Sequence, residues 1–434
     1  MSRARLSIVQ LNDFAGDKVL ANERASQILA EFDPVPVVEW LTHAGHLVTD
    51  DCEFATEFAQ LLNEFGLQVD RLSFGIPILH PQIAGHFFTW EPDTGTTVRA
   101  IPTSQETLLR MENSPLRDAY REGKNTCYRI PPERIPGEFA IYDDLRQEGF
   151  THHSTFAIKF SDGQFKSVTI ATKKEGGFNS SELADFRALV TQLAPLLEIR
   201  SLKLMSRSLL TVYIGASAGS RVLNGEVNRG DGEVIEAVIW FSDLRNSTQL
   251  SSQLSGPEMI SHLNEFFSVA TNAIEAQGGE VLKFIGDAVL AIFPCENINQ
   301  VGCSAAHHAE LAASEVDEKI RAYNAEAMKE GRLPIMFGTA LHIGEVFYGN
   351  IGADSRLDFT VIGPAVNLAS RIESATKETQ KPLLVSKDFA QVSKSKFDQI
   401  GTFRFNGVDG WTGVFAPTEI LSEPKPVLEG ALSV

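Results

Sequence analysis

Two apolar runs on either side of a Gly-Asp pair restrict the fold of this chain more than any other feature of its sequence. The runs cover residues 280–285 and 288–293, and only Gly286 and Asp287 separate them. A two-residue loop that begins with glycine, between two apolar runs, predicts a tight β-hairpin. The turn exposes Asp287, so a carboxylate is expected where two strands meet.

A second carboxylate follows an apolar strand earlier in the chain. Residues 234–241 form a largely apolar run, which ends in Ser242-Asp243-Leu244. The strand would hold Asp243 in place, and backbone groups of the polar loop after it could meet a phosphate, as in many cation sites. A helix N-cap or a turn residue is the alternative interpretation of Asp243, and the strand end alone leaves both open.

Two polar residues share a predicted helix face near residue 370. The run 359–362 is strand-like, and Pro364 is suited to the first turn of the helix that follows. Asn367 and Arg371 are four residues apart and therefore lie on one face of that helix. An amide and a guanidinium together suit a phosphate and a ribose oxygen, whereas a solvated helix face is the alternative.

The order and spacing of these segments closely resemble the class III adenylate/guanylate cyclase family. The resemblance spans residues 229–420, and its motifs are Phe241-x-Asp243-Leu244-Arg245-x-x-Thr248, Lys283-x-x-Gly286-Asp287-Ala288, His342-x-Gly344-Glu345-Val346 and Thr360-Val361-Ile362-Gly363-x-x-Val366-Asn367-x-Ala369-Ser370-Arg371. It implies an α+β fold, with a ferredoxin-like βαββαβ catalytic domain over residues 232–420.

The resemblance also implies a two-metal site. In the family two aspartates hold two divalent ions, Mg²⁺ or Mn²⁺, and here these aspartates would be Asp243 and Asp287, joined by the backbone carbonyl of Leu244. Thr248, in the loop after the first aspartate, would contact the substrate. The implied reaction is two-metal, in-line phosphoryl chemistry, which depends on positioning and electrostatics.

The remaining site residues follow from the same resemblance. Asn367 would orient the ribose, and Arg371 would stabilise the charge of the transition state. Lys283 and Thr360 would read the base; a surface lysine that extends into solvent is the alternative for Lys283. A lysine donor suits the unprotonated N1 of adenine and mismatches the N1–H of guanine, which favours ATP. The Lys/Thr pair resembles a subgroup that often responds to bicarbonate.

The predicted enzyme is therefore an adenylate cyclase, a phosphorus–oxygen lyase that converts ATP to 3′,5′-cyclic AMP and pyrophosphate. A guanylate cyclase, a relative of the diguanylate cyclases, and a catalytically weak cyclase-like regulatory or dimerisation module are the alternatives. Two departures from the family pattern bear on rate: Asn246 stands where a glycine is usual, and Asn406 stands where a lysine often precedes Gly407.

The family assembles its active sites between two head-to-tail catalytic domains. Asp243 and Asp287 would come from one protomer, and the base-reading and transition-state residues from the other. This sequence carries one catalytic domain with both sets of residues. A symmetric homodimer with two sites is therefore expected.

The first half of the chain resembles a GAF-type sensory domain. The resemblance rests on the order of helical and strand-like runs and on Gly176-Gly177-Phe178, before a helix with Asn179 and Glu182 as its capping box. The implied division is an N-terminal helical segment (1–35), a GAF-like regulatory domain (36–200), a connector (201–231), the catalytic domain and a tail (421–434). The first half would be either a sensor of a small molecule or a dimerisation scaffold.

The helix after Asn179 carries apolar residues at heptad spacing, from Leu183 to Leu197. This spacing suits either a coiled-coil seam or a helix packed on its own sheet, and Pro195 is a candidate kink.

Charge and hydropathy indicate the compartment and exclude several partners. The formal net charge of −18 argues against nucleic acid or an anionic membrane as the main partner. The N-terminus has no apolar leader core, and the most apolar stretch, residues 208–219, is too short to span a bilayer. Four cysteines show neither metal-ligand nor disulfide spacing. A cytoplasmic protein is expected.

Overall fold

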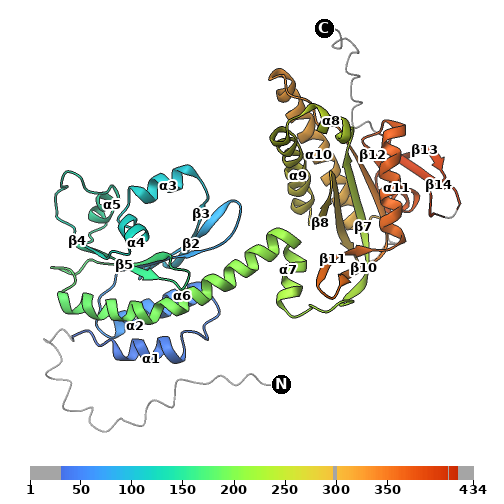
Figure 1. The fold of residues 1–434 in the computed structure, drawn as a ribbon. Coiled ribbons are helices and arrows are strands. Elements are labelled where there is room, and N and C mark those ends of the chain that lie inside the picture. The colour runs from blue at the N-terminus through green and yellow to red at the C-terminus, as the bar shows by residue number, and fades with distance from the viewer. Residues whose placement is uncertain (1–30, 297–300, 409, 419–434) are drawn as a thin grey trace. The chain divides into compact units, whose positions relative to one another are not determined.

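The computed structural model describes residues 31–296, 301–408 and 410–418, and Figure 1 shows the course of the chain. The chain divides into two compact units, Met1–Leu209 and Leu210–Val434. This division falls inside the connector that the sequence predicts at residues 201–231. The predicted N-terminal helical segment lies mostly outside the described residues.

The N-terminal unit is built on a six-stranded antiparallel sheet with the strand order β3-β2-β1-β6-β5-β4. Its elements are α1 (Val35–His43), α2 (Asp51–Glu64), β1 (Arg71–Pro77), β2 (Ile83–Glu91), β3 (Gly95–Pro102), α3 (Gln105–Glu112), α4 (Arg117–Glu122), β4 (Thr126–Arg129), α5 (Ile141–Gln147), β5 (His152–Lys159), β6 (Phe165–Thr172) and α6 (Ser180–Ile214). The turn at Asp162-Gly163 joins β5 to β6, and Gly163 has a positive φ of 83°.

One face of this sheet packs on α1, α2 and α6. Phe54 and Phe58 of α2, Phe74 of β1 and Phe186 of α6 are at most 1% exposed and belong to one apolar cluster. Alternation along each strand turns every second side chain to the opposite face, where α4 packs on β5 and β6. The unit therefore has two chemically different sheet faces.

The packing of helix α6 decides between a coiled-coil seam and a helix packed on its own sheet, the two alternatives that its heptad spacing left open. Its capping box is confirmed, because the Asn179 side chain accepts from the Glu182 amide and the Glu182 carboxylate accepts from the Asn179 amide. Leu193 and Leu197 are at most 1% exposed within the core of their own unit. The apolar stripe is therefore a helix-on-sheet contact and not a coiled-coil seam. The helix continues through Pro195 to Ile214.

The C-terminal unit is a mixed α+β fold. Its elements are α7 (Ala216–Leu223), β7 (Gly232–Leu244), α8 (Ser247–Gln253), α9 (Gly256–Ala276), β8 (Glu280–Ile285), β9 (Ala288–Cys295), α10 (Ser304–Lys329), β10 (Phe337–Ala353), β11 (Arg356–Ile362), α11 (Pro364–Thr379), β12 (Leu383–Ser386), α12 (Lys387–Val392), β13 (Phe397–Phe403) and β14 (Thr412–Pro417). The strand order is β13-β14-β12-β10-β7-β9-β8, and β11 pairs with β10.

The succession β7-α9-β8-β9-α10-β10 reproduces the predicted βαββαβ order. Strands β7 and β10 lie side by side and antiparallel in the middle of the sheet, and β9 pairs with the other edge of β7. Trp240 of β7 and Phe266 of α9 are fully buried between the sheet and the helices that cover it. The predicted hairpin is confirmed as β8 and β9.

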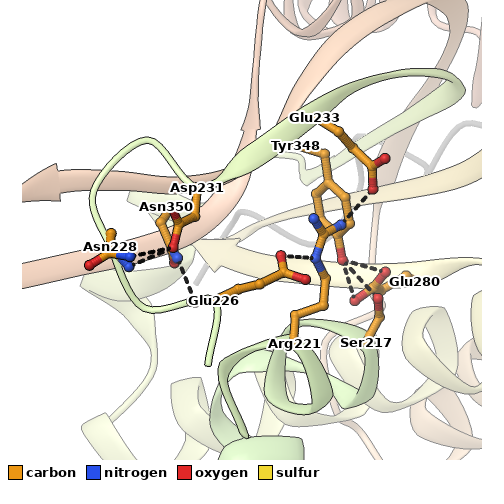
Figure 2. A network of polar contacts seen from close by, with 9 residues as sticks. All are labelled: Ser217, Arg221, Glu226, Asn228, Asp231, Glu233, Glu280, Tyr348 and Asn350. Carbon is orange, nitrogen blue, oxygen red and sulfur yellow. Dashed lines mark hydrogen bonds and ion pairs between the residues drawn. The ribbon is translucent and has the colours of Figure 1, made fainter. Parts of the chain in front are cut away.

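Polar contacts fix the segment before β7 to this sheet (Figure 2). The Tyr348 hydroxyl of β10 lies 2.9 Å from a Glu280 carboxylate oxygen at the start of β8 and 3.1 Å from the Ser217 hydroxyl of α7. Arg221 of α7 pairs with Glu226 at 2.6 Å. Helix α7 and the turns after it, in the second half of the predicted connector, therefore pack as part of the C-terminal unit.

Among the described residues, no helix has the length and apolar content needed to cross a membrane.

Candidate active site

The central strand and the neighbouring hairpin bring the two predicted metal-binding aspartates together. Strand β7 ends at Asp243-Leu244, and the register pairs Asp243 with Ala288, the residue after Asp287. The two-residue turn between β8 and β9 therefore lies beside the end of β7. Both aspartates are partly exposed, whereas the Leu244 side chain is buried.

The two carboxylates interact electrostatically. Burial raises the pKa of Asp243 above its ordinary value, the negative charge of Asp287 raises this pKa further, and Lys377 opposes both effects. Lys377, on α11, donates to the Asp243 carboxylate at 3.0 Å. Two adjacent carboxylates that repel each other and draw a cationic side chain form a donor set that fits a hard divalent cation such as Mg²⁺ or Mn²⁺.

Helix α11 adds a third acidic residue, which interacts with Asp243. Glu373 is 2% exposed, and burial, followed by the charge of Asp243, raises the pKa of Glu373 to about 7. Sequence reasoning missed Glu373 and Lys377. Their i, i+4 spacing is a detectable signal of a shared helix face, and this face is different from the one that carries Asn367 and Arg371.

Arg245 ties the loop after β7 to the end of α11. It is 7% exposed, and its Nη2 donates to the backbone carbonyls of Thr376 and Lys381 at 3.1 and 2.8 Å. Carbonyls near a helix C-terminus lack intrahelical partners and attract cations, so this contact satisfies the two carbonyls, whereas the buried Arg245 Nε has no hydrogen-bond partner among the described residues. Arg245 thereby holds Asp243 and α11 in one arrangement.

The loop that follows requires an unusual backbone conformation. Asn246 has φ 59° and ψ 24°, in the left-handed region, and it precedes α8. Asparagine tolerates this region better than most non-glycine residues, so it can stand where the family usually has glycine. Thr248 lies in the first turn of α8 and is exposed.

The predicted base-reading residues lie on β8 and β11, two strands that contact each other without being paired in the sheet. Lys283 of β8 forms an ion pair with Asp358 of β11, at 2.7 Å. Thr360 lies two residues further along β11 and is buried, and its hydroxyl has no hydrogen-bond partner among the described residues. Asp358 was not identified from the sequence, although period-2 alternation puts it on the same strand face as Thr360.

Asn367 and Arg371 differ from the other predicted site residues in their exposure and their contacts. Both are exposed on α11, and within the described ranges neither side chain makes a hydrogen bond or an ion pair. The structure thus brings together Asp243 with Asp287, and Lys283 with the strand that carries Thr360. It leaves Asn367 and Arg371 pointing to solvent.

One family model matches most of the C-terminal unit. Residues 232–414 match the family model described as the adenylate and guanylate cyclase catalytic domain. An adenylate cyclase of Anabaena cylindrica is 30% identical over 213 residues, which are 48% of this chain and 41% of that protein. Adenylate cyclase 1 of Rhizobium meliloti (strain 1021) is 29% identical over 174 residues, 40% of this chain and 26% of that protein.

Two solved cyclase structures are similar to part of this chain. A bacterial light-regulated adenylyl cyclase is 26% identical, with a TM-score of 0.36, over 43% of this chain and 91% of that chain. The guanylyl cyclase Cya2 is 28% identical, with a TM-score of 0.38, over 42% of this chain and 92% of that chain. The chain spans less than half the length of the two curated relatives named above.

Proposed function

We propose that this protein is an adenylate cyclase, because residues 232–414 match the family model of the adenylate and guanylate cyclase catalytic domain. It would convert ATP to 3′,5′-cyclic AMP and pyrophosphate by in-line attack of the ribose 3′-oxygen on the α-phosphate. The observation that carries the proposal is the placement of Asp243 and Asp287 side by side at the end of the central strand.

Asp243 and Asp287, with the backbone carbonyl of Leu244, would hold two divalent ions. Such ions neutralise phosphate charge and favour formation of the attacking oxyanion. The chain's own contribution is to hold both carboxylates on adjacent strand ends, with Arg245 anchoring the loop. Lys377 would leave Asp243 when a cation binds, because both compete for the same carboxylate oxygens.

Base selection is assigned to Lys283 and Thr360. A lysine amine donates hydrogen bonds only, so it matches the acceptor at adenine N1. The Thr360 hydroxyl has unused hydrogen-bonding capacity in a buried position, which supports a role as acceptor for the adenine amine. The ion pair of Lys283 with Asp358 would orient the amine. A response to bicarbonate is proposed from the Lys/Thr subgroup alone.

Asn367 and Arg371 would serve the active site of a second copy. Both side chains are exposed and without partners in the described part of the chain, as expected of groups that meet substrate across a dimer interface. Asn367 would orient the ribose, and Arg371 would stabilise the negative charge of the transition state. The proposed assembly is a homodimer through the catalytic domains, with two equivalent sites.

The N-terminal unit is proposed to be a GAF-like regulatory domain. Its antiparallel sheet, its helices on both faces and its long exit helix α6 support that assignment. It would bind a small molecule and act on the catalytic unit. With intracellular ATP as substrate, the protein would work in the cytoplasm.

The first experiment compares substrates and removes the metal ligands. The purified full chain should form cyclic AMP from ATP, in Mg²⁺ or Mn²⁺, much faster than cyclic GMP from GTP. Asp243→Ala and Asp287→Ala should each reduce activity to about 1% or less, since each removes a ligand of the site. Thermal melts check that both variants fold. Preference for GTP would reassign the substrate, and substantial activity in either folded variant would contradict the two-metal site.

A further inference from the structure

A row of hydroxyl side chains crosses the N-terminal sheet from one edge to the other. Followed from strand to strand in register, the six aligned positions, one on each strand from β4 to β3, are Thr126, Thr155, Thr169, Ser73, Thr89 and Thr97. Their neighbours along each strand, such as Phe74 and Phe156, point into the apolar core under α2 and α6. Buried polar surface is the informative exception in a protein interior.

The row lies on the sheet face away from that core. Figure 1 shows α3, α4 and α5 on the opposite side of the sheet from α1, α2 and α6. Ser73, Thr155 and Thr169 are buried there, at 4%, 0% and 7% exposure. The hydroxyls of Thr126 and Thr155 find no hydrogen-bond partner in the described part of the chain. A face that served only to pack the helices would carry apolar side chains instead.

Part of this row forms one wall of a cavity of about 530 Å³. Ser73, Thr89, Thr97 and Thr169 contribute from the sheet, and Leu116 and Leu145 contribute from the helical side. The volume lies in the range of cavities that hold small organic molecules. One wall therefore offers groups that both donate and accept hydrogen bonds, and the other wall is apolar.

His153 lines the same cavity. It is 7% exposed, and its Nδ1 is buried without a hydrogen-bond partner among residues 31–296, 301–408 and 410–418. Burial, followed by the positive charge of Arg71, lowers the pKa of His153 to about 4. The ring is therefore neutral at pH 7 and carries one donor and one acceptor nitrogen. An unused buried polar atom favours any ligand that satisfies it.

Two arginines line the cavity, and one of them, Arg99, lies over the Phe87 ring and makes no ion pair in the described part of the chain. Arg71, which lines it, pairs with Glu91 at 2.6 Å and also with Glu148. An anionic ligand at Arg71 would have to compete with these ion pairs. A neutral ligand would not, and it could donate to the hydroxyls of Ser73, Thr97 and Thr169, which themselves already donate to acceptors within the sheet.

We propose that this cavity binds a neutral, flat organic molecule with an apolar body and with hydroxyl or carbonyl groups along one edge. The polar edge would meet His153 and the hydroxyl row, and the body would pack on the leucines of the helical wall. This inference deepens the proposed regulation of the cyclase. The experiments that test it measure ligand binding and stability, not cyclase activity. This inference can therefore fail while the cyclase proposal holds, and the cyclase proposal can fail while this inference holds.

The test uses three ligands of one size on the full-length chain. The probe is 2-naphthol, which is neutral with one polar edge; naphthalene lacks the polar group, and 2-naphthoate replaces it by a charge. We expect 2-naphthol to bind about tenfold more tightly than either, by fluorescence titration or ligand-observed NMR. Equal or tighter binding of 2-naphthoate, or no saturable binding of 2-naphthol, would overturn the proposal.

Substitutions locate the site. Thr169→Val keeps the shape of the side chain and removes a hydroxyl that lines the cavity, and His153→Phe removes both ring nitrogens. Each should weaken 2-naphthol binding about tenfold. Thr155→Val is the matched control, because Thr155 is the next member of the row but does not line the cavity. It should bind 2-naphthol like the unaltered protein and melt at the same temperature or higher.

If Thr169→Val binds 2-naphthol as the unaltered protein does, the site is wrong, even where His153→Phe fails to fold. Equal losses in Thr169→Val and Thr155→Val would also reject it, since the effect would then be a general loosening of the sheet.

Discussion

At the scale of single residues, the chemistry of the catalytic unit is concentrated where strands end. Asp243 is the last residue but one of β7, and Asp287 occupies the turn after β8. Strand pairing converts these two sequence positions into neighbours, and burial, together with the charge of Asp287, raises the pKa of Asp243. Lys283 and Thr360 are similarly placed by β8 and by β11, and their proposed task is to distinguish the two purine bases.

The first residue-scale prediction concerns that distinction. Changing Lys283 to Glu together with Thr360 to Cys should collapse the preference for ATP over GTP, because it removes the donor to N1 and the acceptor for the adenine amine. Loss of a well-placed polar contact costs several kcal/mol of discrimination. The measurement is kcat/KM for both nucleotides. Unchanged selectivity in a folded double variant would show that other residues read the base.

A second residue-scale prediction concerns His342. It is 5% exposed on β10, its Nδ1 lies 2.8 Å from the Ser386 hydroxyl, and burial lowers the pKa of His342 to about 4. The unfolded chain binds a proton below about pH 6.5, whereas the folded chain does so only near pH 4. Stability from the neutral ring is thus present above pH 6.5 and is lost as the pH falls towards 4, by an amount on the order of 3 kcal/mol.

The replacement His342→Gln should therefore flatten the acid side of the stability curve, measured as the unfolding free energy in urea between pH 7 and about pH 5. His307→Gln is the control, because His307 is exposed on α10. Parallel curves for the unaltered protein and His342→Gln would refute the assignment.

At the scale of elements, the segment before the catalytic sheet depends on a small polar cluster. The Tyr348 ring is 5% exposed, its hydroxyl contacts both Glu280 and Ser217, and Arg221 lies over the ring at 5.4 Å from its centroid. These contacts join α7 to β8 and β10, the strands that lead to Lys283 and, through β11, to Thr360. The cluster links the segment between the units to the proposed base-reading strands (Figure 2).

The element-scale prediction is that Tyr348→Phe loosens α7 while the sheet remains folded. Removing the hydroxyl takes one donor from the Glu280 carboxylate, which keeps the Ser217 hydroxyl and the Ala218 amide, at a cost of roughly 1–3 kcal/mol. Hydrogen exchange should accelerate in residues 215–231 more than in β7 or β9. Tyr323→Phe is the control, since Tyr323, on α10, also loses a hydroxyl contact, to Arg332. Unchanged exchange in 215–231 would show that the cluster does not hold α7.

Helix α6 illustrates how far an element can be predicted. Its N-terminal capping box uses residues three positions apart, and this local signal identified the helix start correctly. The stripe from Leu183 to Leu197 has the same spacing whether it packs on a sheet or on another helix. Only the tertiary structure shows that the sheet covers it.

At the scale of the whole molecule, the proposed active site needs two chains. The aspartate pair is assembled within one catalytic unit, and Arg371 is exposed without a partner in the described part of the chain. In a symmetric head-to-tail dimer, each site would take its aspartates from one chain and Arg371 from the other.

The molecular prediction is complementation between two inactive variants. Mixing Asp243→Ala with Arg371→Ala puts both lesions in one site of each mixed dimer and leaves the other site intact. Half the dimers are mixed after random exchange, so about a quarter of the original activity should return. Each variant alone is the negative control, and light scattering checks that both dimerise. Absence of recovery from two dimerising variants would contradict the shared site.

Local sequence patterns determined several secondary-structure elements of this protein. Alternating apolar residues and a Gly-Asp turn specify the β8–β9 hairpin, and Pro364 marks the start of α11, because such signals act within a few residues. The ion pairs Lys377–Asp243 and Lys283–Asp358, by contrast, join residues 134 and 75 positions apart. No local periodicity reports such a separation. These partners, the buried Glu373 and the hydroxyl row across six strands were decided by tertiary packing, because only strand register and helix docking determine which distant side chains meet.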